Sequence, residues 1–235
     1  MVRGPAALLA VYGAALAYFE IASSLPALAT RDATVIASGA VGVIALAACV
    51  LVLLPARDEA APLAALALGG GLLAGALTAA HAGPGANAAK VLAAAAAGLL
   101  LARILDAPAF AVAIPLFVAG IDVASVLAGP SAVLIREQPR AVDYLTFPLP
   151  VWGGHRAGQL GLSDMIFLAF FAGSAWRHGF RRRATAIALV AALVAVVAAS
   201  VLADRALPVL PALALAFLGP NLDRLRPMFA RLRAG

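Results

Sequence analysis

A succession of long apolar segments constrains this chain more than any other feature of its sequence. A transmembrane helix needs roughly 17 to 25 mainly apolar residues, and eight segments qualify: 5–28, 33–55, 61–81, 86–105, 108–129, 160–177, 184–203 and 206–219. The composition agrees, with 64% hydrophobic residues, 12% charged residues and a mean hydropathy of +1.02. We therefore expect an all-α polytopic membrane protein with about eight (eight or nine) transmembrane helices.

The length of the first apolar segment and the presence of a single cysteine exclude several other classes of protein. The apolar run that follows MVRG continues to about residue 29 and is followed by further spans, so we interpret it as a transmembrane helix rather than a signal peptide. Cys49 lies alone inside an apolar run, which leaves no disulfide framework and no cysteine-based metal site. The sequence predicts neither a metal nor a cofactor.

The basic residues predict how the chain is oriented in its membrane. With an even number of spans both termini lie on one side, and that side collects eleven of the 17 basic residues, against six on the other. Because cytoplasmic loops carry the excess of basic residues, we expect a multi-pass inner-membrane protein with both termini cytoplasmic and the loop 130–159 outside. The net charge of +6 then contacts anionic lipid headgroups of the bilayer and does not indicate nucleic-acid binding.

Four acidic residues lie within or at the ends of these apolar segments, where an ionisable group is costly and is by default a functional candidate. Asp106 precedes a proline at a helix boundary, so we assign it to a turn or a helix cap. Glu20 lies near a helix end, where it either lines a cavity or bonds to a neighbouring helix. Asp122 and Asp164 are set in strongly apolar segments and remain the functional candidates.

Asp122 and Asp164 lie on two successive spans, which are normally neighbours in space. Two facing carboxylates can share one proton, so that one acts as general base on a water and the other as general acid on a peptide bond. Gly161 and Ser163 would leave room for a substrate or a neighbouring helix. On these residues alone, an ion or proton site in a transporter is an equally good interpretation.

A third motif introduces a family resemblance. Residues 208–213 read PVLPAL, so Leu210, Pro211, Ala212 and Leu213 place a proline-alanine-leucine motif at the start of the last span. With Ile121-Asp122 and Gly161-Leu162-Ser163-Asp164 earlier in the chain, residues 108–220 resemble the presenilin and signal peptide peptidase family of intramembrane aspartyl proteases. The resemblance implies that Asp122 and Asp164 are the catalytic pair. Gly161, Leu162, Ser163 and residues 210–213 would support the active site and bind substrate.

This chain also departs from the family pattern. Ile121 stands where the family has tyrosine, Ser163 stands where it has glycine, and we expect four spans before Asp122 where the family has five. Type IV prepilin peptidases share the two-aspartate chemistry, but they usually carry a lysine shortly after the second aspartate, where this chain has Met165 and Ile166. The prepilin peptidases are therefore the second candidate family.

The segment DYLTFPLPVW, residues 143–152, resembles the strand-prone stretch that precedes the second aspartate in the presenilin family. An unwound substrate could add to such a strand by β-augmentation, through Leu145, Thr146, Phe147, Pro148 and Leu149. The alternative is an ordinary proline-rich surface loop. In other spans, Gly39 and Gly42, and likewise Gly71 and Gly75, indicate helix packing.

Together these features predict three regions: a helical scaffold over 1–107, a catalytic membrane region over 108–220 and a basic amphipathic tail over 221–235. In that tail Leu222, Leu225, Phe229 and Leu232 recur at helical spacing, which is typical of a helix on a membrane surface. The predicted function is intramembrane hydrolysis of transmembrane peptide or protein substrates, either signal-peptide-like or single-span. The sequence leaves the oligomeric state open.

Overall fold

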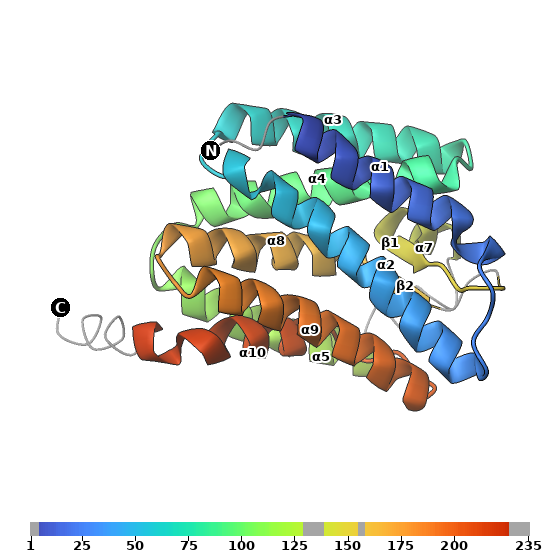
Figure 1. Cartoon of the computed structure of the whole chain (residues 1–235). Coiled ribbons are helices and arrows are strands. Elements are labelled where there is room, and N and C mark those ends of the chain that lie inside the picture. The colour runs from blue at the N-terminus through green and yellow to red at the C-terminus, as the bar shows by residue number, and fades with distance from the viewer. Residues whose placement is uncertain (1–4, 129–138, 155–157, 226–235) are drawn as a thin grey trace.

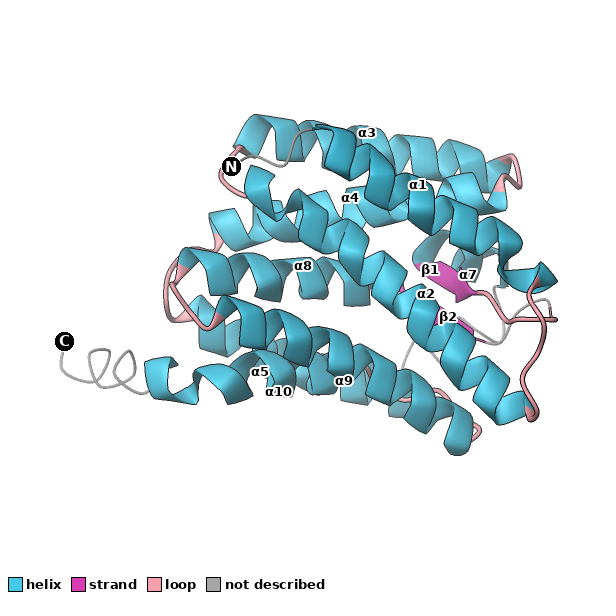
Figure 2. Cartoon of the chain, in the orientation of Figure 1, coloured by secondary structure: helices cyan, strands magenta, loops and turns pink. Residues whose placement is uncertain are grey.

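The computed structural model describes residues 5–128, 139–154 and 158–225, and within them the chain is mostly helical (Figures 1 and 2). The helices are α1 (Pro5–Ile21), α2 (Arg31–Leu53), α3 (Ala60–Ala79), α4 (Gly83–Ile104), α5 (Phe110–Ala128), α7 (Pro139–Leu145), α8 (Leu162–Arg177), α9 (Arg182–Leu202) and α10 (Leu210–Leu218). Three short 3₁₀ turns cover Ala22–Ser24, Leu54–Ala56 and Gly219–Asn221.

Each of the eight predicted apolar segments contains a helix, but the helices differ in length. Five are long and apolar enough to cross a membrane, namely Pro5–Ser24, Arg31–Ala56, Ala60–Ala79, Gly83–Ile104 and Arg182–Leu202. α8 has 16 residues and α10 has nine, and the apolar stretch of α5 is also shorter than the five. Over the described residues the fold is therefore that of a helical multi-pass membrane protein with five candidate spanning helices, not the eight that we expected.

Small residues determine how closely the helices pack. α4 runs along both α3 and α8, α2 packs against α9, and α10 packs against α5, α8 and α9. A Cβ atom at Gly98 of α4 would lie 2.1 Å from the carbonyl oxygen of Ile166 in α8, so only glycine permits this contact. α8 is accordingly the most enclosed helix of residues 108–220, with Met165, Phe170 and Phe171 fully buried.

The glycine predictions divide into two groups. Gly39 and Gly42 of α2 do pack closely, since a Cβ at Gly39 would lie 2.9 Å from Val197 Cγ1 of α9 and one at Gly42 would lie 3.4 Å from Leu149 Cδ2. Gly71 and Gly75 of α3 do not, because a Cβ at either position would meet no described atom within 4 Å. The packing prediction for Gly71 and Gly75 is therefore wrong within this chain.

A two-stranded hairpin precedes α8. β1 (Thr146–Leu149) pairs antiparallel with β2 (Gly158–Gly161), with Thr146 opposite Gly161 and Phe147 opposite Leu160. The predicted strand over 145–149 is confirmed from Thr146 onward, whereas Leu145 is the last residue of α7. β2 was not predicted, and the expected span from residue 160 begins as a helix only at Leu162. The predicted tail helix lies outside the described residues beyond Leu225.

Candidate functional site

Asp164 lies at the point where β2 turns into α8. It is the third residue of α8 and only 6% exposed, and its carboxylate oxygen Oδ2 accepts a hydrogen bond of 2.9 Å from the backbone N–H of Gly161. A Cβ at Gly161 would lie 3.0 Å from this Oδ2 and 3.2 Å from Ser163 Oγ. The backbone there has an ordinary φ of −70°, so glycine is needed for space and not for its conformational freedom.

Asp122 is held in a similar way by a different helix. It lies in α5 and is partly exposed, and its Oδ2 accepts a hydrogen bond of 2.8 Å from the backbone N–H of Leu210, the first residue of α10. The first amides of a helix have no acceptor within it and carry its positive dipole end, so a carboxylate there is stabilised.

The two carboxyl groups lie close enough to interact electrostatically. The expected direct packing of their helices is not what brings them together, because α5 and α8 share little contact while α10 packs against both. The proline-alanine-leucine motif opens α10, so its first amide reaches Asp122 as its buried Leu213 joins the core around α8. Within the described ranges, neither aspartate forms a salt bridge with a lysine or arginine.

The other residues that the motifs predicted lie around these two points. Leu210 and Leu213 are buried, Pro211, Ala212 and Leu162 are partly exposed, and Ser163 is exposed. The Ser163 hydroxyl makes no hydrogen bond to Asp164 in the described structure, although it lies beside Gly161. Ser163 therefore fits beside the aspartate without being a direct partner of its carboxylate.

Lys90 has a structural role that the sequence did not predict, since it counted there only among the basic residues that indicate topology. It is the one lysine of the chain, lies in α4 and is 5% exposed. Its Nζ donates to the carbonyl oxygens of Asp143, near the end of α7, and Thr146, at the start of β1, the latter at 3.1 Å. Because Thr146 pairs with Gly161, this lysine holds the strand against which the Asp164 junction is built. The sequence feature that could have pointed to this role is that Lys90 is a single lysine within an apolar segment.

The remaining two acids lie apart from the pair. Asp106, in the turn between α4 and α5, accepts hydrogen bonds from Arg177 Nε (2.9 Å) and Nη2 (2.6 Å), and this contact lowers the pKa of its carboxyl group. Asp106 is therefore an ion-pair partner in a turn and not a helix cap. Glu20 is exposed at the end of α1. No cluster of three or more potential metal-binding His, Cys, Asp or Glu side chains occurs among the described residues.

Comparison of this chain with family models, with curated proteins and with solved structures found no match.

Proposed function

We propose that this chain is an intramembrane aspartyl protease that hydrolyses peptide bonds within transmembrane segments. The observation that carries the proposal is the arrangement of Asp122 and Asp164. Each carboxylate accepts a main-chain N–H at the start of a helix, and the two groups interact with each other. The motif resemblance over residues 108–220 supports the same assignment and names the same two residues.

The chemistry follows from two carboxyl groups that share one proton. The ionised aspartate removes a proton from a water molecule, whose oxygen attacks the carbonyl carbon of the peptide bond. The protonated aspartate donates its proton to the carbonyl oxygen, which gives a tetrahedral intermediate. The aspartate that took the proton from water then gives it to the leaving nitrogen as the C–N bond breaks. The products are a carboxylic acid and an amine. Since main-chain amides hold both aspartates, neither is fixed permanently as an anion by a neighbouring cation.

The hairpin suggests how a substrate is presented. A helical segment can be cut only after its backbone is unwound, and an unwound segment can add to the open edge of a strand. β2 pairs with β1 along one edge, its residues Gly158 and Gln159 are exposed, and it leads directly to Asp164. β1 is less suited to pair with a substrate strand, because Pro148 has no backbone N–H to donate. We therefore propose β2 as the substrate-binding strand, supported from behind by residues 146–149.

The short lengths of α8 and α10 support an active site that lies below the membrane surface. α8 is about 24 Å long and α10 about 14 Å, both short of the roughly 30 Å of a hydrocarbon core. If α8 ends level with its neighbours, its first turn and the hairpin lie at membrane depth. Backbone in strands is tolerated there when it is paired and surrounded by protein. Eight crossings with both termini cytoplasmic remain part of this proposal.

Cleavage of a single-span substrate by the purified chain in lipid bilayers tests the proposal. We expect Asp122→Asn and Asp164→Asn each to reduce cleavage to background, because Asn retains the shape of the side chain but cannot exchange the proton. Asp106→Asn, a similar change at the far end of the bundle, is the control and should retain cleavage. Cleavage that persists in both active-site variants would show that other residues carry the reaction.

A proton-coupled transporter is the second candidate function, because a buried acid such as Asp164 next to a second carboxylate also suits a proton-binding site. Proton flux into liposomes that contain the chain distinguishes the two functions. Flux that depends on both aspartates, without cleavage of a broad panel of substrates, would favour the transporter.

A further inference from the structure

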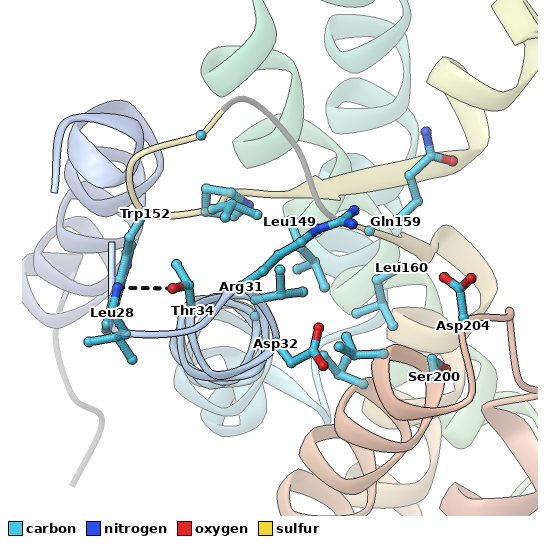
Figure 3. A pocket seen from close by; sticks show the side chains of 18 of the residues that line it. Leu28, Arg31, Asp32, Thr34, Leu149, Trp152, Gln159, Leu160, Ser200 and Asp204 are labelled. Atoms are coloured by element: carbon cyan, nitrogen blue, oxygen red, sulfur yellow. Dashed lines mark hydrogen bonds between the residues drawn. The ribbon is translucent and has the colours of Figure 1, made fainter. Parts of the chain in front are cut away.

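A cavity of about 770 Å³ lies at the end of the bundle where the hairpin meets the α1–α2 and α9–α10 connections (Figure 3). Its walls come from the start of α2, the end of α9 and the hairpin. Neither Asp122 nor Asp164 lines it. Its volume lies within the range of sites that bind small organic ligands, so the cavity has room for a ligand that does not contact the aspartate pair.

The cavity changes from charged to apolar with depth. Its mouth carries the exposed residues Arg31 and Asp32 of α2 and Asp204 and Arg205 just after α9. About 12 Å further along α2, Gly39 touches Val197 of α9, and this contact closes the floor. Between them the lining includes Leu149, Leu160 and Val196. A ligand that fills this cavity must therefore have a charged end and an apolar end.

The charges at the mouth come as two arginine–aspartate doublets, one from each side. Arg31 extends across the cavity toward the side that carries Gln159, while Asp32 and Asp204 lie on opposite walls (Figure 3). In the part of the chain that the structure describes, none of the four side chains forms a salt bridge. Two positive and two negative groups without ionic partners complement a ligand that itself carries one charge of each sign.

Two aromatic residues indicate that this mouth lies near a membrane surface. Trp152 lines the cavity, and its indole Nε1 donates a hydrogen bond of 3.3 Å to the hydroxyl of Tyr18. Tryptophan and tyrosine gather at the membrane–water interface, because their rings are apolar and their polar atoms reach water. Phospholipid headgroups occupy this same depth.

We propose that this cavity binds a phospholipid with a phosphoethanolamine headgroup. The phosphate bonds to Arg31 and Arg205, the ammonium group donates to Asp32 and Asp204, and the upper part of an acyl chain lies against Val196 and Val197. A primary ammonium group has three N–H donors for the two carboxylates, whereas the quaternary ammonium of choline has none. An anionic headgroup would leave both aspartates facing a like charge. The cavity shares Gly158, Gln159 and Leu160 with the strand proposed to bind substrate. Lipid binding is measured without cleavage, so its failure is distinguishable from a failure of the proposed function.

Binding of defined lipids to the delipidated full-length chain in detergent tests this assignment. The lipids are phosphatidylethanolamine, phosphatidylcholine and phosphatidylglycerol with identical acyl chains, and free phosphoethanolamine serves as the ligand without an apolar end. We expect phosphatidylethanolamine to bind at least about tenfold more tightly than the other two lipids, since one lost charge-assisted hydrogen bond corresponds to about that factor. Free phosphoethanolamine should bind far more weakly, because it leaves the apolar floor empty.

Variants separate the contribution of each end of the cavity. Arg31→Gln with Arg205→Gln should weaken phosphatidylethanolamine binding at least about tenfold, and Asp32→Asn with Asp204→Asn should abolish the preference over phosphatidylcholine. Ser200→Trp fills the cavity without changing its charges and should also reduce binding. Arg183→Gln, an exposed arginine at the opposite end of the bundle, is the control and should bind like the parent.

Three results would overturn the proposal. Equal affinity for phosphatidylglycerol and phosphatidylethanolamine would show that the arginines and aspartates at the mouth do not select a headgroup with one charge of each sign. Unchanged binding in both the arginine variant and Ser200→Trp would place the lipid elsewhere. A peptide that co-purifies with the chain and is not displaced by phosphatidylethanolamine would assign the cavity to a protein segment.

Discussion

At the scale of single residues, the two candidate catalytic side chains are held by main-chain amides, Asp164 by Gly161 and Asp122 by Leu210. An arginine or lysine in either place would bind the carboxylate as a permanent anion and would oppose a shared proton. An amide instead orients the oxygen and carries only a partial charge. The position of each aspartate therefore depends on backbone geometry, which makes the residues that set this geometry the most informative to change.

Gly161→Ala tests the space beside Asp164. The added Cβ would lie 3.0 Å from the carboxylate oxygen and 3.2 Å from Ser163 Oγ, so the carboxylate must move and its bond to the Gly161 amide must weaken. A displacement of this kind should reduce cleavage about 10- to 100-fold. Gly13→Ala in α1, outside the proposed site, is the control, since its Cβ would meet no described atom within 4 Å. Equal cleavage by the two variants would contradict this role of Gly161.

Lys90→Met tests the support of the hairpin. Methionine keeps the length of the side chain but removes the donor, so the bonds to the carbonyl oxygens of Asp143 and Thr146 are lost. We expect the free energy of unfolding to fall by about 1 to 3 kcal/mol, measured by denaturation in detergent. Under the proposed function, the distribution of cleaved bonds should also shift, because the strand register is no longer held.

The control for Lys90 is Thr78→Val in α3, which removes a hydroxyl that, within the described ranges, bonds to the carbonyl oxygen of Ala74 in its own helix and to no other group. Such bonds contribute little to stability, so this variant should unfold like the parent. If Lys90→Met also unfolds like the parent and cleaves the same bonds, the lysine does not position the hairpin.

At the scale of elements, the sequence predicted helices well and the hairpin only in part. TFPL in β1 has strand-forming residues, but Gly158-Gln159-Leu160-Gly161 has two glycines and a single apolar residue. Its strand conformation depends on pairing with β1, a contact between distant residues that local propensity does not reveal. Likewise, Gly39 packs against another helix and Gly71 does not, although both are glycines in apolar spans. Whether a glycine makes a close helix contact depends on which helix lies beside it, and the sequence does not specify that neighbour.

In the candidate site too, the residues were predicted from the sequence but their contacts were not. The motifs predicted Asp122, Asp164 and Gly161, because residue type and spacing carry that information. They did not predict that Asp122 bonds to the first amide of α10, or that α10 rather than direct contact between α5 and α8 links the two aspartates. These depend on how three helices pack. Lys90 was missed because the two contacts that tie it to the hairpin are to backbone carbonyls, which every residue has.

Arg177 joins three elements at the end of the bundle away from the hairpin, and its pairing predicts a pH dependence. It bonds to Asp106 in the α4–α5 turn and to Asp58 in the α2–α3 turn. The Arg177 hydrogen bonds hold the pKa of Asp106 below its usual value of 3.8, with smaller contributions from the positive charges of His178 and Arg103. A carboxyl group with a lowered pKa in the folded state stabilises it above its unfolded pKa, and this stability is lost as the pH falls through the folded pKa.

We therefore expect the melting temperature of the parent to fall more steeply below about pH 4 than that of Asp106→Asn, which has no proton to gain there. Melting curves between neutral pH and about pH 3 in low salt provide the measurement, and added salt should reduce the difference because Asp106 is half exposed. Glu59→Gln, at an exposed glutamate that forms no ion pair with the described residues, is the control. Parallel curves for the parent and Asp106→Asn would contradict a stabilising role of this pair.

At the scale of the whole molecule, the connections between helices divide into two sets at opposite ends of the bundle (Figure 1). The α2–α3, α4–α5 and α8–α9 connections lie at the end where α1 begins and α10 finishes, and the α1–α2, α3–α4 and α9–α10 connections lie at the hairpin end. This alternation is what eight crossings require. Among the described residues, however, five helices have the length of a full crossing, so the short α10 is the critical case.

Labelling of single cysteines with a membrane-impermeant maleimide in intact cells tests these crossings. In a Cys49→Ala background, we expect Ala80→Cys and Ala203→Cys to be labelled from outside, and Glu59→Cys and Arg183→Cys only after permeabilisation. Arg224→Cys, just beyond α10, decides whether nine helical residues and their flanking turns cross the bilayer. Its protection in intact cells supports eight crossings, whereas its labelling alongside Ala203→Cys would place both ends of α10 outside. The parent, whose Cys49 is fully buried, should remain unlabelled in both conditions and is the control for non-specific reaction.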